Sequence, residues 1–158
     1  MADPQSDPDR GVSPSVWRFV RASRAHVVID AADYFAVMQV AMRRARQRIM
    51  VIGWDFDTRI HLGPRRRWWF RPSKLDMPAR LGAFIVWLCK RTPDLEVLLL
   101  KWNIGALKFI FRGSMALDLL RWVFHRQITM KFDSAHPLGC SHHQKIVVID
   151  DKFAVCGG

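Results

Sequence analysis

The last sixteen residues of the chain combine side chains that could carry out chemistry on a phosphodiester. His143 and Lys145 are separated by one residue, Asp150 follows after four more, and Gly157 and Gly158 come after a further six. Chance should bring these five residue types together at this spacing in on the order of one chain in ten thousand. The pattern is therefore a specific signal.

An imidazole close to an ammonium group suits reactions at phosphorus. A neutral histidine can attack phosphorus and form a covalent intermediate, which divides one difficult displacement into two easier steps. Lys145 could hold the non-bridging oxygens and offset the charge that develops in the transition state. A second histidine, protonated, must give a proton to the leaving oxygen. The sequence contains one His-x-Lys, so a second would come from elsewhere.

The residues between these side chains predict how they are held. Ile146 to Ile149 is an unbroken β-branched run, typical of a buried strand. Because side chains alternate along a strand, His143 and Lys145 should share a face. Asp150 has the opposite parity and begins a turn, so we expect it to brace the site through hydrogen bonds rather than contact substrate. The glycine pair would allow close backbone approach to the imidazole.

The string resembles the HKD motif of the phospholipase D superfamily. Residues 31–57, which end in Gly-Trp-Asp-Phe-Asp, are also similar to bacterial phospholipase D-like and cardiolipin synthase-like proteins, as are residues 95–102 and 136–143. The resemblance implies a two-lobed α/β sandwich with one motif in each lobe. It implies His143 as the nucleophile, Lys145 as the phosphate clamp and Asp150 as the bracing carboxylate. Lys145, Gly157 and Gly158 would bind substrate.

The elements upstream of the motif predict the α/β class. Apolar runs alternate with helical spacing, which favours a mixed, largely parallel sheet flanked by helices. Asp30 should cap a first helix, whose inward stripe is expected to hold Tyr34, Val37, Ala41 and Ala45. Asp76 should cap a second helix, with Pro78 in its first turn. We expect a buried strand at 49–52, further strands at 95–102 and 128–132, and a third helix at 114–126.

The domain boundaries follow from composition and from the resemblance. Residues 1–24 begin with a stretch rich in Pro, Asp and Ser and are expected to be a mobile lead-in. Residues 25–158 are expected to be a first phospholipase D-like lobe. Family members continue past the two glycines, so we expect this lobe to be truncated after the motif and incomplete at its C-terminus.

Charge and cysteine usage limit the partners and the compartment. The chain carries 25 Lys and Arg against 14 Asp and Glu, a net charge of +11, which favours an anionic partner, either a lipid surface or nucleic acid. Cys89, Cys140 and Cys156 have no paired spacing, so we expect reduced thiols in a cytoplasmic protein, with neither a metal nor another cofactor. The polar N-terminus and the absence of a long apolar run predict that any membrane contact is peripheral, at the inner face.

The roles of several other residues can be interpreted in more than one way. The basic, aromatic loop from Arg65 to Lys74 could bind lipid headgroups, grip nucleic acid or simply be solvated. Asp55 and Asp57 follow a predicted strand, where functional groups gather, but local turn contacts are the favoured explanation. The remaining histidines favour surface or packing roles, namely His26, His61, His125, His136 and His142.

The leading hypothesis is a phosphodiesterase of the phospholipase D type. It would hydrolyse or transfer the phosphatidyl group of phospholipids through a phosphohistidine. Its partners would be a phospholipid or anionic membrane surface and a second HKD lobe, in the same full-length chain or in a dimer mate. Alternatives are a single-motif dimeric nuclease, with nucleic acid as the less favoured partner, and an inactive truncated lobe. The isolated 158-residue chain is expected to be inactive unless it pairs with another lobe.

Overall fold

A computed structural model of the chain describes residues 21–53, 57–62, 77–102, 114–133 and 143–157. These residues form an α/β structure with three helices and five strands. The elements in chain order are α1 (Ala31–Arg44), β1 (Arg48–Gly53), α2 (Leu81–Arg91), β2 (Glu96–Trp102), α3 (Ser114–Val123), β3 (Ile128–Asp133), β4 (Lys145–Ile149) and β5 (Phe153–Gly157). The predicted α/β class is confirmed.

The strands form one mixed sheet in the order β3-β2-β1-β4-β5. β1, β2 and β3 are parallel to one another, whereas β4 runs antiparallel to β1, and β5 antiparallel to β4. The sheet is therefore half parallel and half antiparallel in its pairings, and the expectation of a largely parallel sheet was too strong. The physical reason is that a tight hairpin joins β4 to β5, and a hairpin can join only antiparallel strands.

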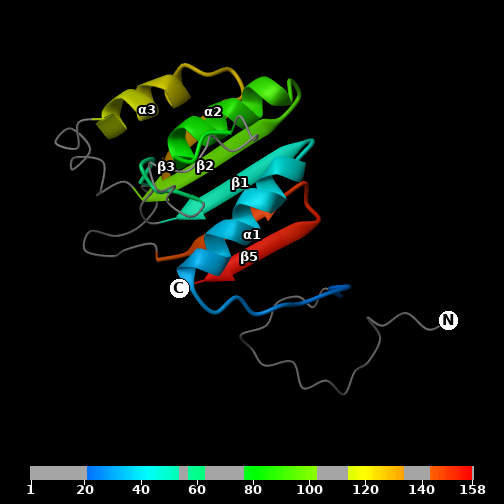
Figure 1. Cartoon of the computed structure of the whole chain (residues 1–158). Helices are drawn as coiled ribbons and strands as arrows, with labels where there is room; N and C mark the ends of the chain where they lie inside the picture. Colours follow the sequence, from blue (N-terminus) through cyan, green and yellow to red (C-terminus); the bar gives the residue numbers. More distant parts are fainter. Residues whose placement is uncertain (1–20, 54–56, 63–76, 103–113, 134–142, 158) are drawn as a thin grey trace.

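All three helices cover the same face of this sheet (Figure 1). The core between helices and sheet takes alternate strand residues, so the intervening residues face the other way. This core includes Met38, Met42, Ile49, Phe84, Leu88, Val97, Leu99, Trp122, Val147 and Ile149. On the opposite face, Met50, Ile52, Leu98 and Leu100 line a shallow groove of about 400 Å³. The second helical layer of a sandwich is not found among the described residues.

The first helix begins as predicted and buries most of the expected stripe. The carboxylate of Asp30 accepts a hydrogen bond of 2.8 Å from the backbone N–H of Asp33, which confirms the N-cap. Met38 and Met42 are buried, whereas Val37, which we expected in the inward stripe, is 38% exposed. Ala45 lies in the core, and Tyr34 and Ala41 pack against it, as expected.

The boundaries of the other helices also differ from expectation. α2 begins at Leu81, after an N-cap at Arg80 that has no side-chain cap, so Pro78 precedes the helix rather than lying in its first turn. Asp76 lies outside the described residues. Thr92 is the C-cap of the helix. α3 ends at Val123 instead of Arg126, because a tight turn precedes β3: the N–H of Ile128 donates to the carbonyl of His125.

The turn predicted at Asp150 is present and joins β4 to β5 in a hairpin. Asp150 and Asp151 both have positive φ, 51° and 54°, and the N–H of Lys152 donates to the carbonyl of Ile149 at 3.0 Å. Two consecutive positive φ values define a type I′ turn, whose twist matches that of antiparallel strands. Asp tolerates this conformation better than β-branched residues do.

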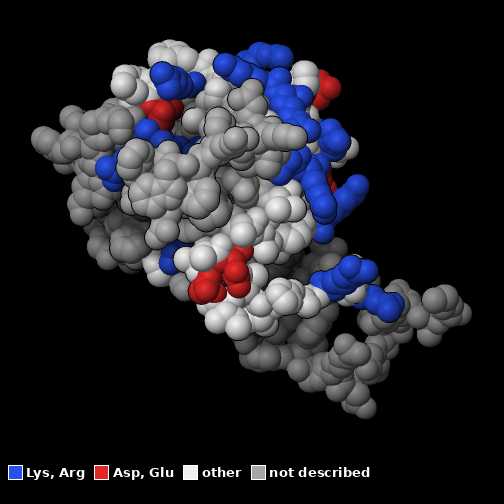
Figure 2. Space-filling model, in the orientation of Figure 1, with Lys and Arg blue, Asp and Glu red and all other residues white. Residues whose placement is uncertain are grey.

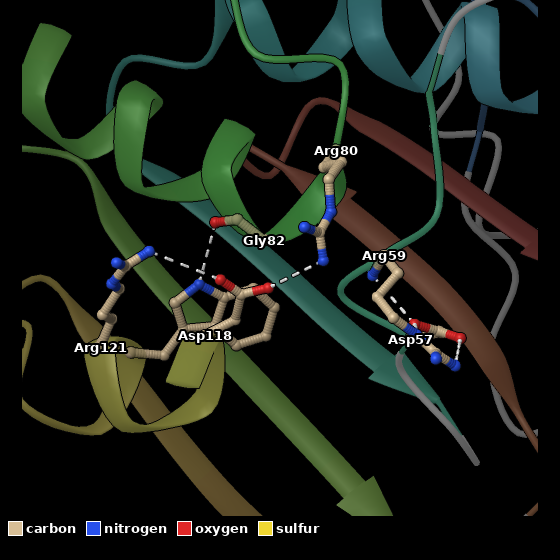
Figure 3. A network of polar contacts seen from close by, with 7 residues as sticks. Asp57, Arg59, Arg80, Gly82, Asp118 and Arg121 are labelled. Carbon is tan, nitrogen blue, oxygen red and sulfur yellow. Dashed lines mark hydrogen bonds and ion pairs between the residues drawn. The ribbon is translucent and has the colours of Figure 1, made fainter. Parts of the chain in front are cut away.

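Gly82, in the first turn of α2, permits close packing against α3 (Figure 3). Its carbonyl accepts a hydrogen bond of 3.2 Å from the indole N–H of Trp122, and the carboxylate of Asp118 lies beside it. Asp118 pairs in turn with Arg80 at 3.6 Å and Arg121 at 3.8 Å. A Cβ at Gly82 would meet Asp118 Oδ2 at 2.8 Å and Thr58 Cβ at 2.9 Å. Both contacts are too short for a real side chain.

We predict that Gly82→Ala lowers the free energy of unfolding by about 1–3 kcal/mol, the usual cost of overpacking. Helix propensity alone would give the opposite sign, because alanine is favoured over glycine in a helix by up to about 1 kcal/mol. Urea unfolding followed by circular dichroism measures the difference. The matched control is Ala83→Gly at the exposed neighbouring position, which should cost about 1 kcal/mol or less. A Gly82→Ala protein more stable than wild type would contradict the close contact.

Candidate active site

His143 and Lys145 lie together at the start of β4. Lys145 is the first residue of the strand, and its Nζ is 3.5 Å from Nε2 of His143. Both residues are exposed. In the neutral tautomer with the proton on Nδ1, the Nε2 lone pair faces the ammonium group. The pair can therefore offer a nucleophilic nitrogen and a phosphate-binding cation at one point.

The pair lies where the three parallel strands end. β4 is antiparallel to β1, so the first residues of β4 lie beside the last residues of β1, and Ile146 pairs with Ile52. Continuing that register places Lys145 next to Gly53. The carboxyl edge of parallel strands is where α/β proteins commonly bind ligands, because loops diverge there and leave room. The position of the pair is consistent with a substrate site.

Asp150 lies at the other end of β4, separated from Lys145 by the length of the strand, about 17 Å. Its carboxylate accepts three backbone hydrogen bonds, from the N–H groups of Arg46 (2.9 Å), Gln47 (2.8 Å) and Arg48 (2.9 Å). Its own N–H donates to the carbonyl of Arg48 at 2.8 Å. Asp150 thus ties the hairpin to the turn between α1 and β1, and within this chain it has no direct contact with the His143–Lys145 pair.

These hydrogen bonds also determine the protonation of Asp150. Burial alone would raise the pKa of this carboxyl group, but the backbone N–H groups of Arg48, Gln47 and Arg46, together with the charge of Lys152, hold the pKa below its usual value. The carboxylate is therefore ionised at neutral pH and acts as a permanent acceptor.

The glycines are placed only in part. Gly157 pairs with Lys145 across β4 and β5, and a Cβ at Gly157 would have no heavy atom within 4 Å. The close backbone approach expected at this glycine is therefore not seen in the chain itself. Gly158 lies outside the described residues, as do His136, His142, Asp55 and the Arg65–Lys74 loop.

Lys101 was not singled out from the sequence. It lies one residue before the end of β2 and is fully buried. The available signal was a charged residue inside the apolar run Leu98-Leu-Leu-Lys-Trp. The apolar run by itself predicts only a strand, and a lysine is almost never fully buried unless it is paired.

Asp57 has the structural role that was favoured from the sequence. Its carboxylate accepts hydrogen bonds from the backbone N–H of Arg59 at 2.9 Å and from the guanidinium group of Arg59 at 2.9 and 2.7 Å (Figure 3). These contacts close the turn that follows β1. The local turn explains this aspartate.

Basic side chains gather at the opposite edge of the sheet from the His143–Lys145 pair. α1 ends with Arg43 and Arg44, and α2 ends with Lys90 and Arg91. Figure 2 shows Lys and Arg concentrated where these helices end. Positive side chains there interact favourably with the helix dipoles. They lie too far from His143 to hold the phosphate group that it would attack.

Neither a metal cluster nor a membrane span is found in the described part of the chain. No three His, Cys, Asp or Glu side chains there lie together in an arrangement that could hold a metal ion. No described helix has both the length and the apolar character needed to cross a bilayer.

Comparison with known proteins identifies distant relatives. No family model matches the chain. Phospholipase D A of Dictyostelium discoideum is 26% identical over 148 residues, which cover 92% of this chain and 11% of that protein. Phospholipase D C and phospholipase D B of the same organism are 25% and 23% identical over 132 and 130 residues. These similarities support a phospholipase D-like relationship.

The similarity covers only a small part of the length of each relative. The matches to phospholipases D C and D B each cover 82% of this chain, but only 8% and 10% of those two proteins. It spans about a tenth of the length of the curated relatives it matches.

We predict that Asp150→Asn lowers the free energy of unfolding at pH 7 by about 1–3 kcal/mol, because the amide has one acceptor oxygen where the carboxylate has two. The pKa of Asp150 is lowered in the folded state, so its contribution is complete above the unfolded pKa, about 3.9, and is lost as pH falls through the folded value. Urea unfolding at several pH values should show the two proteins converging in acid.

Asp151→Asn is the matched control for this experiment. Asp151 lies in the same turn with the same sign of φ, but its side chain is 70% exposed and makes a 3.7 Å ion pair with Arg48. Exposed pairs of this kind contribute about 1 kcal/mol or less. Equal losses in the two variants would contradict a special role for the three hydrogen bonds of Asp150.

Proposed function

We propose that this chain is one half of the active site of a phospholipase D-type phosphodiesterase, which hydrolyses or transfers the phosphatidyl group of phospholipids. The observation that carries the proposal is the contact between His143 and Lys145, exposed together at the carboxyl edge of the parallel strands. The distant similarity to phospholipase D proteins supports lipid rather than nucleic acid as the substrate class.

In the proposed reaction the substrate phosphate replaces the imidazole as the partner of the Lys145 ammonium group. Nε2 of His143 attacks phosphorus, a nitrogen–phosphorus bond forms, and the bond from phosphorus to the headgroup oxygen breaks. Lys145 offsets the negative charge on the non-bridging oxygens in the transition state. A protonated histidine outside this motif gives its proton to the headgroup oxygen. Water or an alcohol then attacks phosphorus, releases His143 and returns a proton to that second histidine.

The second histidine defines the partner that the proposal requires. It would belong to a second HKD lobe, supplied either by a longer protein that contains this segment or by a dimer mate. The isolated chain then offers the nucleophile and one phosphate clamp but not the acid, and it should be inactive alone. Asp150 contributes indirectly, by fixing the strand that carries the other two residues. The proposed setting is the cytoplasm, with peripheral contact at the inner membrane face.

We predict that His143→Ala in the full-length protein lowers kcat for headgroup release by roughly 10³-fold or more, because no other group can form the covalent intermediate. Headgroup release from phosphatidylcholine and phosphatidylglycerol vesicles measures this. The control is His26→Ala, since His26 is an exposed histidine outside the helices and strands, and it should retain wild-type activity. A His143→Ala enzyme with normal kcat would reject the nucleophile.

We also predict that EDTA leaves activity unchanged, because the proposed mechanism uses two histidines and a lysine and no metal-bound water. Denaturing the enzyme during turnover of phosphate-labelled lipid should trap acid-labile label on the protein, and His143→Ala should abolish it. Strong inhibition by EDTA would reject this mechanism. Cleavage of single-stranded DNA but not of phospholipid would favour the nuclease alternative.

A further inference from the structure

Lys101 is the one charged side chain among the fully buried residues that the structure describes. It faces the same side of the sheet as the buried residues Val97 and Leu99 of its own strand. Removing an ammonium group from water is costly unless other groups compensate for it, and Lys101 does have an interaction partner.

The strand registers place Lys101 in line with Lys145. Lys101 pairs with Gly53 on one side of β1, and the pairing of Ile52 with Ile146 brings Lys145 to the other side of Gly53. Both lysines have the parity of core residues on their strands, so they stand on the same face. Gly53 contributes no side chain between them. Two strand spacings separate their backbones, about 10 Å.

We propose that Lys101 is a positioning residue of the same site, whose buried positive charge helps Lys145 to hold the substrate phosphate. This inference rests on the proposed function where it names a phospholipid as the substrate. The binding of a phosphate anion by Lys101 and Lys145 does not depend on that function. If the separation of the two backbones, about 10 Å, is taken for the distance from the charge to the anion, a full unit charge changes affinity by up to about tenfold at the effective dielectric constant usual near protein surfaces. Because Lys101 is buried, salt screens its effect less than that of the exposed Lys145.

The alternative is that Lys101 only stabilises the fold through its own partner. The two roles differ in what they change. A stabilising residue affects the free energy of unfolding and leaves the phosphate affinity of the folded protein unaltered. A positioning residue changes the affinity for phosphate in protein that remains folded, and for a phosphodiester substrate it raises KM more than it lowers kcat.

The test uses the full-length protein with inorganic phosphate as the probe. Lys101→Gln removes the charge and keeps hydrogen-bonding capacity for the buried partner, whereas Lys101→Met removes both. The matched control is Lys131→Gln, because Lys131 lies on the neighbouring strand, is exposed, and pairs with Leu100 on the opposite face. Circular dichroism establishes folding, and calorimetry at low and high salt measures the Kd for phosphate.

We expect Lys101→Gln to raise the Kd for phosphate about tenfold, to retain most of this effect at high salt, and to raise KM for phospholipid more than it lowers kcat. Lys131→Gln should match wild type. A folded Lys101→Gln or Lys101→Met protein with the wild-type phosphate Kd overturns the inference, as does a wild-type protein that does not bind phosphate. If neither neutral variant folds, the lysine ammonium NMR signals of wild-type protein decide. A phosphate titration that shifts the Lys145 signal but leaves the Lys101 signal in place contradicts the proposal.

The result also separates this inference from the proposed function. Phosphate binding that depends on Lys101, in a protein that cleaves no phosphodiester, would reject the function and leave the anion site in place. Cleavage of phospholipid with phosphate affinity independent of Lys101 would reject only the inference.

Discussion

The pairing of β4 with β1 is the constraint on which the site depends. Asp150 fixes this pairing at one end, since its carboxylate and its N–H both bind the first residues of β1 and the turn before them. With that end fixed, the five residues of β4 carry Lys145 to the opposite edge of the sheet. A slip of one residue would turn His143 and Lys145 to the other face. The spacing from Lys145 to Asp150 is thus the length of strand β4. The proposed catalytic residues lie at one end of the strand, and the hydrogen bonds that fix its register lie at the other.

This division of labour explains which parts of the structure could be predicted from the sequence. The Asp30 cap, the hairpin at Asp150 and the shared face of His143 and Lys145 all follow from local rules of capping, turns and side-chain alternation. The antiparallel direction of β4 against β1 does not, because it depends on contacts between residues about a hundred positions apart. A pattern of alternating helices and strands favours parallel pairing, and nothing local in the β4 sequence opposes it.

The errors within the helices have a similar cause. Val37 and Met38 are adjacent on α1, and helical spacing alone allows either to head the inward stripe. In the structure Met38 lies in the core cluster with Ile49, whereas Val37 is exposed. The importance of Lys101 also depends on the order of the strands, which the local sequence does not give. In the sequence it interrupts an apolar strand by one residue, and only the lateral order β2-β1-β4 shows that it lies in line with Lys145.

The two edges of the sheet therefore meet different physical demands. At the amino edge, backbone hydrogen bonds to Asp150 and cations at the helix ends satisfy groups that would otherwise be unpaired, so this edge favours stability. At the carboxyl edge, Lys101 and Lys145 stand two strands apart with a glycine between them. Like charges repel at this separation, and Lys101 also has an interaction partner of its own. An anion bound between the lysines would reduce the repulsion between them, which is the physical basis of the phosphate site that we propose at this edge.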